Sequence, residues 1–311
     1  MVIGIDIGGT KCAVMTADEH GNLLQKVKFP TTSCEETLDR IFSAVEGFGP
    51  CQSIGISCGG PLDEQAGLIL SPPNLPGWDR IPLTNMLTER FGVPAYLCND
   101  ANACALAEWK FGAGQGTRNM VFLTFGTGLG AGLILDGRLY SGTNGNAGEV
   151  GHVRLAPTGP VGYGKAGSFE GFCSGGGIRQ LGMTLAKEAL ERGEPPSFCP
   201  SYNALEQITA KNLAEAADAG DPLAQEVYRR SARRLGMGLS MIIDILNPEA
   251  IVIGSVFARS EHLFREEMER VLNEEALSPA AKVCRVLPAA LGDAIGDYAA
   301  IAVAMGASRL S

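Results

Sequence analysis

The sequence lacks the features that mark membrane and secreted proteins. It has no run of about 18 consecutive apolar residues, the minimum for a membrane-spanning helix. Residues 1–15 lack the basic start and the long apolar segment of a signal peptide. The nine cysteines include no Cys-x-x-Cys pair, and thiols without paired spacing are typical of a reduced compartment. We therefore expect a cytoplasmic protein that has no membrane partner.

Two further absences narrow the function. Lys and Arg number 25 against 34 Asp and Glu, for a net charge of −9, whereas a nucleic-acid-binding surface needs clustered basic side chains. We expect no nucleic-acid partner. The sequence also has no Gly-Lys-Ser or Gly-Lys-Thr at the spacing of a Walker A loop, which excludes the P-loop class. An anionic ligand must therefore be held by other local features.

Glycine, by contrast, is in excess. It makes up 41 of the 311 residues, against an average of about 7 percent, while the hydrophobic share of 45% suffices for a sizeable core. The length fits one large or two medium domains. Alternating strand and helix patterns favour an α/β fold. Helices are predicted over 35–47, 83–91, 100–110, 223–246 and 294–307, and strands over 52–57, 95–98 and 251–253.

The chain opens with a predicted three-stranded meander, and a second one follows the same plan. The first has apolar runs at 2–7, 12–16 and 23–29, separated by glycine-containing turns. The second has strands at 120–125, 131–135 and 138–140. This repetition suggests two domains with a boundary near residue 115.

The tip of the first hairpin in each meander is a loop of Gly and Thr. Such a loop after a buried strand can direct several backbone N–H groups at one anion. Asp6, just before the first loop, could position Mg²⁺. A plain hairpin turn is the alternative for either loop alone, but two such loops favour phosphate binding. The second loop also matches a dinucleotide fingerprint, which we reject because a strand follows it where a helix is required.

These loops and three other segments resemble the motifs of the ROK family of sugar kinases. The run from Asp6 to Lys11 resembles the family's first phosphate motif, and Gly126 to Gly132 its second. Residues 74–78 and 99–102 resemble the sugar-site segments, and 147–152 the family signature. The resemblance implies an α/β, two-domain actin-like ATPase (ribonuclease H-like) fold with a central cleft, MgATP as a substrate, and a homodimer.

The resemblance also implies roles for single residues. Asp100 is the expected catalytic base, and its place between a strand end and a helix start supports a ligand site, although a helix N-cap is the alternative. The sugar hydroxyls would be bound by Asn74, Asn99, Asp100, Glu149, His152 and Glu170. ATP and its phosphates would be bound by Asp6, Gly8, Gly9, Thr10, Lys11, Gly126, Thr127, Gly128 and Gly254.

One departure from the family concerns a structural zinc ion. Many members bind zinc with the His of the signature and three cysteines, whereas here Val161, Tyr163 and Ser168 stand in the cysteine positions. A Cys₃His site cannot be built from His152 alone. We therefore predict no structural zinc, and expect packing around Tyr163 and Phe169 to hold the loop instead.

The resemblance predicts a smaller N-terminal domain, 1–115, a larger C-terminal domain, 116–295, and a helix at about 296–311 that packs back on the first. The expected function is ATP-dependent phosphorylation of a hexose at the 6-hydroxyl, with glucose favoured by residues 74–78. N-acetylmannosamine, N-acetylglucosamine or a β-glucoside are alternative acceptors. The family also contains sugar-responsive repressors with a helix-turn-helix ahead of the first phosphate loop. Because that loop begins at residue 6 here, a non-catalytic sugar sensor is the less favoured reading.

Overall fold

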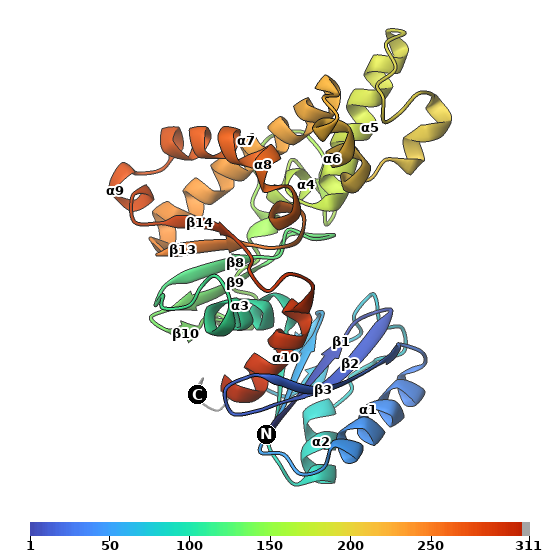
Figure 1. Cartoon of the computed structure of the whole chain (residues 1–311), viewed down its shortest axis with the longest axis vertical. Helices are drawn as coiled ribbons and strands as arrows, with labels where there is room; N and C mark the ends of the chain where they lie inside the picture. Colours follow the sequence, from blue (N-terminus) through green and yellow to red (C-terminus); the bar gives the residue numbers. More distant parts are fainter. Residues whose placement is uncertain (307–311) are drawn as a thin grey trace. The chain divides into compact units, whose positions relative to one another are not determined.

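A computed structural model describes residues 1–306 (Figure 1). The contacts divide the chain into two compact units. Unit 1 consists of Met1–Arg118, Gly132–Ala147 and the C-terminal segment from Ala290 on. Unit 2 consists of Asn119–Ala131 and Gly148–Ala289. No helix within residues 1–306 is long and apolar enough to cross a membrane.

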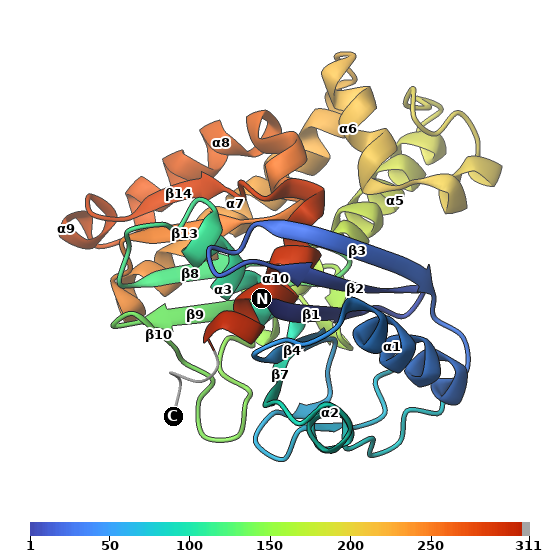
Figure 2. The ribbon, with the colours of Figure 1, turned by 60° about the horizontal axis from the view of Figure 1, so that its bottom comes forward.

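Unit 1 is built on a five-stranded mixed sheet in the order β3-β2-β1-β4-β7 (Figure 2). The first two pairings are antiparallel and the last two, β1 with β4 and β4 with β7, are parallel. The strands are β1 (Val2–Ile7), β2 (Lys11–Ala17), β3 (Leu23–Pro30), β4 (Ile54–Cys58) and β7 (Ala95–Asn99). Unit 1 also contains the short hairpin of β5 (Leu62–Asp63) and β6 (Leu68–Ile69). The antiparallel pair of β9 (Ala131–Leu135) and β10 (Arg138–Leu139) belongs to unit 1 from Gly132 on.

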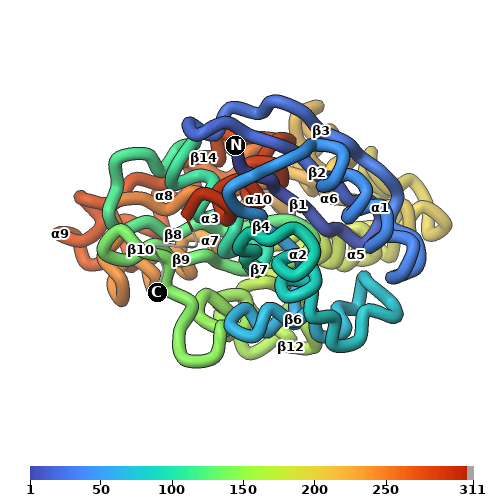
Figure 3. The backbone as a smooth tube through the Cα atoms, turned by 90° about the horizontal axis from the view of Figure 1, so that it is seen from below, coloured from blue at the N-terminus to red at the C-terminus, as the bar shows by residue number. Residues whose placement is uncertain are grey.

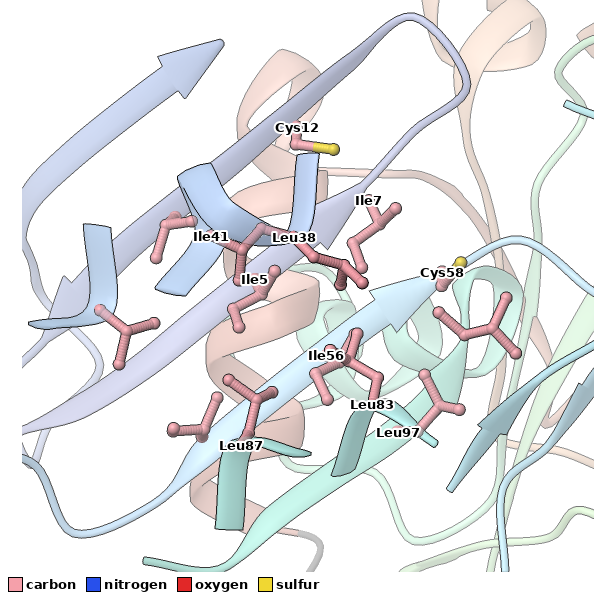
Figure 4. Close-up of a cluster of buried hydrophobic side chains, with 14 of the residues drawn as sticks. Ile5, Ile7, Cys12, Leu38, Ile41, Ile56, Cys58, Leu83, Leu87 and Leu97 are labelled. Carbon is pink, nitrogen blue, oxygen red and sulfur yellow. The ribbon is translucent and has the colours of Figure 1, made fainter. Parts of the chain in front are cut away.

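Two amphipathic helices close one face of this sheet, α1 (Cys34–Phe48) and α2 (Leu83–Phe91). Figure 4 shows Ile5 and Ile56 of the strands facing Leu38 of α1 and Leu83 of α2, and all of these side chains are buried. The helix α1 starts at a Ser33 cap, whose hydroxyl accepts the Glu36 N–H, so the first residue of the helix is fixed locally.

The other face is covered by α10 (Ile295–Gly306), which lies beside α3 (Asp100–Phe111) in both Figure 1 and Figure 3. The chain therefore returns to its first sheet after more than 150 residues spent mostly in unit 2. The approach is close because β4 carries a glycine here. A Cβ atom on Gly55 would lie 2.2 Å from the Ala304 nitrogen and 2.4 Å from the Ala300 oxygen.

Unit 2 contains a parallel three-stranded arrangement, in which β13 (Ala250–Ile253) pairs with β8 (Met120–Leu123) and β14 (Arg285–Pro288). Its two longest helices, α7 (Pro222–Leu246) and α8 (Ser255–Glu275), pack along each other (Figure 1). The remaining elements are η1 (Val150–His152), β11 (Val161–Gly162), β12 (Lys165–Ala166), α4 (Phe169–Phe172), α5 (Gly175–Glu191), η2 (Tyr202–Gln207), α6 (Ala210–Asp218) and α9 (Ser278–Ala281); η3 (Gly292–Ala294) belongs to unit 1.

The predicted α/β class is confirmed, and each predicted helix and strand is present within a few residues of its expected bounds. The predicted domain limits, 1–115 and 116–295, remain a prediction, and the contact units differ from them by grouping Gly132–Ala147 with unit 1. The predicted C-terminal helix, about 296–311, corresponds to α10, which starts at Ile295 and packs on the sheet of unit 1. Its last five residues, 307–311, lie outside the described residues.

Candidate functional site

Three parallel strands bring the predicted acidic residues of unit 1 to one edge of the sheet. Asp6 on β1 is in register with Ser57 on β4, which is in register with Cys98 on β7. The carboxyl ends of these strands therefore lie side by side, and each is followed by a loop or by a helix start. Asp100 follows the last of them directly. Ligands of α/β sheets bind at such an edge.

The Gly8-Gly9 loop sits at the same edge and joins β1 to β2. The loop is closed by the Gly8 N–H, which donates to the Lys11 carbonyl at 3.1 Å. Asn74 packs against it, since a Cβ atom on Gly9 would lie 2.7 Å from the Asn74 Cβ. The loop residues Gly9, Thr10 and Lys11 are exposed. Only glycine permits this contact, and it places the predicted sugar-site amide of Asn74 next to the predicted phosphate loop.

The junction between β7 and α3 holds Asp100 at the start of the helix. Asn99, and not Asp100, is the N-cap residue, and its side-chain oxygen accepts the Ala101 N–H at 3.0 Å. Asp100 also accepts that N–H, at 2.8 Å, from the first turn of the helix. The other carboxylate oxygen of Asp100 faces Gly59: a Cβ atom added to Gly59 would lie 3.8 Å from it. Glu64, from the β5-β6 hairpin, accepts the Asn99 N–H at 2.7 Å and so fixes the junction.

Asp6 is half-buried among other charges. Burial, followed by the negative charges of Asp297 and Asp100, raises its pKa to about 6, while Lys26 and Lys11 act in the opposite direction. The Lys26 ammonium is paired with Asp297, at the start of α10. Two carboxylates therefore disfavour the charge of Asp6. A carboxylate whose charge is destabilised in this way favours a bound cation such as Mg²⁺.

In unit 2, the predicted second phosphate loop meets two helix N-termini. The Gly175 N–H, in the first turn of α5, donates to the Gly126 carbonyl at 2.8 Å. The Val256 N–H, in the first turn of α8, donates to the Phe125 carbonyl at 3.1 Å. Gly176 lies against Thr127, since its Cβ would be 3.5 Å from the Thr127 oxygen. The start of α5 and the first turn of α8 therefore both hydrogen-bond this loop, and the N-terminus of a long helix such as α5 suits phosphate groups.

Gly254 caps α8 at the end of β13, and its N–H donates to the Leu123 carbonyl at 2.9 Å. The predicted nucleotide residues Gly126, Thr127, Gly128 and Gly254 are therefore brought together within unit 2. The next residue, Ser255, adopts the left-handed region with a φ of 55°. Its hydroxyl is the nearest atom, at 3.6 Å, to the Cβ position of Gly126.

Glu170 also contacts this loop. Its carboxylate accepts the Leu129 N–H at 3.0 Å, and a Cβ atom on Gly128 would lie 2.7 Å from the same oxygen. The η1 turn that carries Glu149 and His152 packs here as well, because a Cβ on Gly151 would lie 3.2 Å from the Glu170 Cβ. Both Glu149 and His152 are exposed. The three predicted sugar-binding residues of unit 2 thus share one surface region beside the phosphate loop.

The loop in the place of the family's zinc site is held without cysteine. Ser168 caps α4, and Phe169 is fully buried against Gly238 of α7. The expectation that packing around Tyr163 holds the loop is wrong, because this residue is 82% exposed, although its ring forms a T-shaped pair with the His152 ring. Gln180 holds the loop instead, with two 2.9 Å hydrogen bonds to the Val161 backbone.

Among residues 1–306, no three His, Cys, Asp or Glu side chains are placed to hold a metal ion together. Cys173, the cysteine nearest to the loop in sequence, is buried and donates to the Ser231 carbonyl, and burial raises the pKa of its thiol. The absence of structural zinc stays a prediction.

Sequence reasoning missed several residues of these regions. Asp297 and Lys26 are the charges next to Asp6, and Glu64 positions the Asn99 backbone. Of these three residues, only Asp297 could have been found from the sequence, because it is a carboxylate in the first turn of an otherwise apolar helix. The N-terminus of α5 was also missed, although the three glycines after Ser174 mark it in the sequence.

Comparison with known proteins identifies the family of this chain. The model of the ROK family matches residues 2–307 of the chain. The chain belongs to the ROK family. Among ROK relatives, it is 38% identical over 259 residues to a glucokinase of Streptomyces coelicolor, covering 82% of this chain and 81% of that protein.

A solved ROK glucokinase of Streptomyces griseus, in complex with glucose and AMPPNP, superposes with a TM-score of 0.76 at 32% identity and covers 97% of this chain and 98% of that one. The ROK relatives also include a xylose repressor of Caldicellulosiruptor bescii, 32% identical over 72% of this chain and 55% of the repressor. The expected actin-like ATPase fold of a ROK kinase is therefore confirmed.

Proposed function

We propose that this ROK protein transfers the γ-phosphoryl group of ATP to the 6-hydroxyl of a hexose, with glucose as the preferred acceptor. The observation that supports this best is the position of Asp100 at the sheet edge that also holds Asp6 and the Gly8-Gly9 loop. The glucokinases among the relatives support the choice of glucose.

Asp100 would act as the general base. As the hydroxyl oxygen of the sugar attacks the γ-phosphorus, the bond to the bridging oxygen of ADP breaks and the hydroxyl proton passes to the Asp100 carboxylate. The contacts of Asp100 with the first turn of α3 hold the carboxylate in one orientation. This orientation matters because the base must lie within hydrogen-bond reach of the hydroxyl.

The phosphates would be bound by backbone groups. In unit 1 these belong to Gly8, Gly9 and Thr10, with Lys11 adding a positive charge, and in unit 2 to the loop of Gly126, Thr127 and Gly128 with the N-termini of α5 and α8. Asp6 fits a Mg²⁺ ion, which would neutralise the phosphate oxygens. Gly254 would lie at the nucleotide. The sugar hydroxyls would be bound by Asn74, Asn99, Asp100, Glu149, His152 and Glu170.

We further propose a cytoplasmic homodimer without structural zinc that binds neither nucleic acid nor membrane. The net charge of −9 and the unpaired cysteine spacing support this setting.

The test is coupled ADP release with MgATP against glucose, mannose, fructose, N-acetylmannosamine, N-acetylglucosamine and a β-glucoside. We expect the highest kcat/KM for glucose. A preference for an acetamido sugar would keep the mechanism and contradict the choice of acceptor.

The matched variants are Asp100→Asn and, as control, Asp39→Asn at an exposed position of α1. A positioned base contributes about 10²- to 10⁴-fold to rate. We expect Asp100→Asn to lose kcat by such a factor with sugar affinity kept, and Asp39→Asn to behave like the wild type.

A sugar-binding regulator is the second candidate, and the similarity to a xylose repressor supports it. Calorimetric binding of glucose with no ADP production by the wild-type protein would favour the regulator over the kinase.

A further inference from the structure

A pocket of about 600 Å³ lies in unit 2, away from the predicted phosphate loop and sugar-binding residues of that unit. Its walls are α5, α7 and the loop at Thr158, Gly159 and Pro160, and Phe172 of α4 lines it as well. Its volume falls within the range of small-molecule sites, about 300–1,000 Å³. None of the residues proposed to bind ATP or sugar lines it.

The pocket is strongly basic, although the protein as a whole is acidic. Four arginines from little more than one turn of α7 line it, and its one acidic lining residue is Glu226. The four are Arg229, Arg230, Arg233 and Arg234. The lining therefore carries a formal charge of +3, in a chain whose net charge is −9.

Two carboxylates pair with three of the four arginines, and only one of these carboxylates, Glu226, lines the pocket. Glu226 accepts from the Nε atoms of both Arg229 and Arg230 at 2.7 Å. Arg233 reaches Glu267 only at 3.7 Å, and Glu267 is shared with an arginine outside the pocket. The contacts of Arg234 are with an aromatic ring and a sulfur atom, and not with a carboxylate.

Arg234 is held by neutral groups instead. Its guanidinium carbon lies 5.0 Å from the centroid of the Phe172 ring, and one of its nitrogens is 3.1 Å from the Met237 sulfur. These contacts orient the guanidinium without neutralising it, so its remaining N–H groups can bind an anion. Leu181 and Leu185 of α5 add apolar surface to the same pocket.

We propose that this pocket binds a small organic phosphate, a second anion site separate from the phosphate loops. The arginine forks match the geometry of a phosphate dianion, and an apolar part of the ligand would lie beside Leu181 and Leu185 of α5. The volume exceeds what inorganic phosphate alone would fill. This proposal does not depend on the kinase function.

The test is isothermal titration calorimetry of the whole protein with phenyl phosphate, inorganic phosphate and benzyl alcohol, at low salt. We expect saturable binding of phenyl phosphate, tighter than that of inorganic phosphate, and no binding of benzyl alcohol. Removing two arginine contacts in the double variant Arg230→Gln/Arg234→Gln should weaken phenyl phosphate at least about tenfold.

Two further variants keep the result interpretable. Arg192→Gln, at the end of α5 and outside the pocket, should bind within twofold of the wild type. Arg234→Lys keeps the charge but loses the planar fork and the stacking, so we expect an intermediate loss, and it remains informative if the double variant fails to fold.

Four outcomes would overturn the proposal. The first is no saturable heat with either phosphate, and the second is displacement of phenyl phosphate by MgADP, which would place it at the nucleotide site. The third is equal weakening in Arg192→Gln. The fourth is benzyl alcohol binding as tightly as phenyl phosphate, which would make the pocket merely apolar.

Discussion

Asp6 occupies a position that destabilises its own charge. Its pKa is raised from 3.8 to about 6 by burial and by the carboxylates of Asp297 and Asp100. Between about pH 4 and pH 6 the folded protein keeps a proton that the unfolded chain has released. Stability therefore falls as pH rises through this window and stays reduced above it. A carboxylate whose pKa is raised by burial and by neighbouring negative charges is typical of a functional site.

Asp6→Asn removes the destabilised charge. We expect it to raise the free energy of unfolding at pH 7.5 by on the order of 2 kcal/mol, because each pKa unit corresponds to about 1.4 kcal/mol and partial exposure reduces the effect. The gain should vanish near pH 4. Urea unfolding at several pH values measures it, with Asp39→Asn as control. A stability loss at pH 7.5 would contradict the assignment of the pKa shift.

The sequence predicted the single acidic residues of the site, but not the side chains that form hydrogen bonds or ion pairs around them. Asp100 was found through the family resemblance, which its place at a helix start supported, and Asp6 was found because it precedes the first Gly/Thr loop. Glu64 was missed because its hydrogen bond to the Asn99 backbone joins segments 35 residues apart through a short hairpin that no apolar pattern marks. Lys26 pairs with Asp297 across 271 residues, and nothing local in the sequence indicates such a pair.

Among the elements, the contact of α10 with β4 gives the sharpest test of packing. A Cβ on Gly55 would overlap with backbone atoms of Ala300 and Ala304, which no rotamer change can relieve. We expect Gly55→Ala to lower the free energy of unfolding by about 1–3 kcal/mol. Chemical denaturation measures this.

The matched control is Gly47→Ala. Gly47 lies within α1, where an added Cβ meets no atom within 4 Å. The substitution should raise stability by about 0.5–1 kcal/mol, since alanine is the better helix former. If both variants lost stability equally, close packing of α10 on β4 would not be the cause.

The loop at residues 161–168 gives a test of metal content. Because hydrogen bonds of Gln180 and the burial of Phe169 hold it, we expect no stoichiometric zinc in protein purified without chelator, and no change in Tm when EDTA is added. Elemental analysis checks this. One zinc equivalent per chain, lost together with His152→Ala, would contradict the prediction.

Local signals, and not length, decided which elements were predictable, because the long helices α5 and α8 were not among the predicted ranges. The α7 helix was expected over 223–246 and is observed at Pro222–Leu246, because its amphipathic repeat and its Asp-Pro start are both strong signals. The two-residue strands of the β5-β6 and β11-β12 hairpins are too short to show alternation. β14 was missed because its four residues, Arg285–Pro288, are only partly buried or exposed.

For the whole molecule, the return of the chain to its first sheet was expected from the family resemblance, and α10 does pack on β1 and β4. The grouping of Gly132–Ala147 with unit 1 was not predicted. It depends on contacts such as that of Gly132 with Ala105, whose Cβ lies 2.5 Å from the Cβ position of the glycine. Such contacts join distant segments, which one sequence does not reveal.

The proposed homodimer is tested at this scale. Sedimentation velocity should give a single species of twice the 32.6 kDa chain mass, with no shift when salt is raised to 0.5 M. A species at the chain mass over micromolar concentrations would contradict the dimer and leave the kinase proposal intact.

The central claim is that Asp100 takes the proton of a hexose hydroxyl during phosphoryl transfer. The most direct measurement is ³¹P NMR of glucose 6-phosphate formed from MgATP and glucose, with glucose binding followed in parallel by calorimetry. We predict turnover by the wild type, and a loss of about 10²-fold or more in Asp100→Asn with glucose binding retained. Wild-type turnover that Asp100→Asn leaves unchanged would contradict the account.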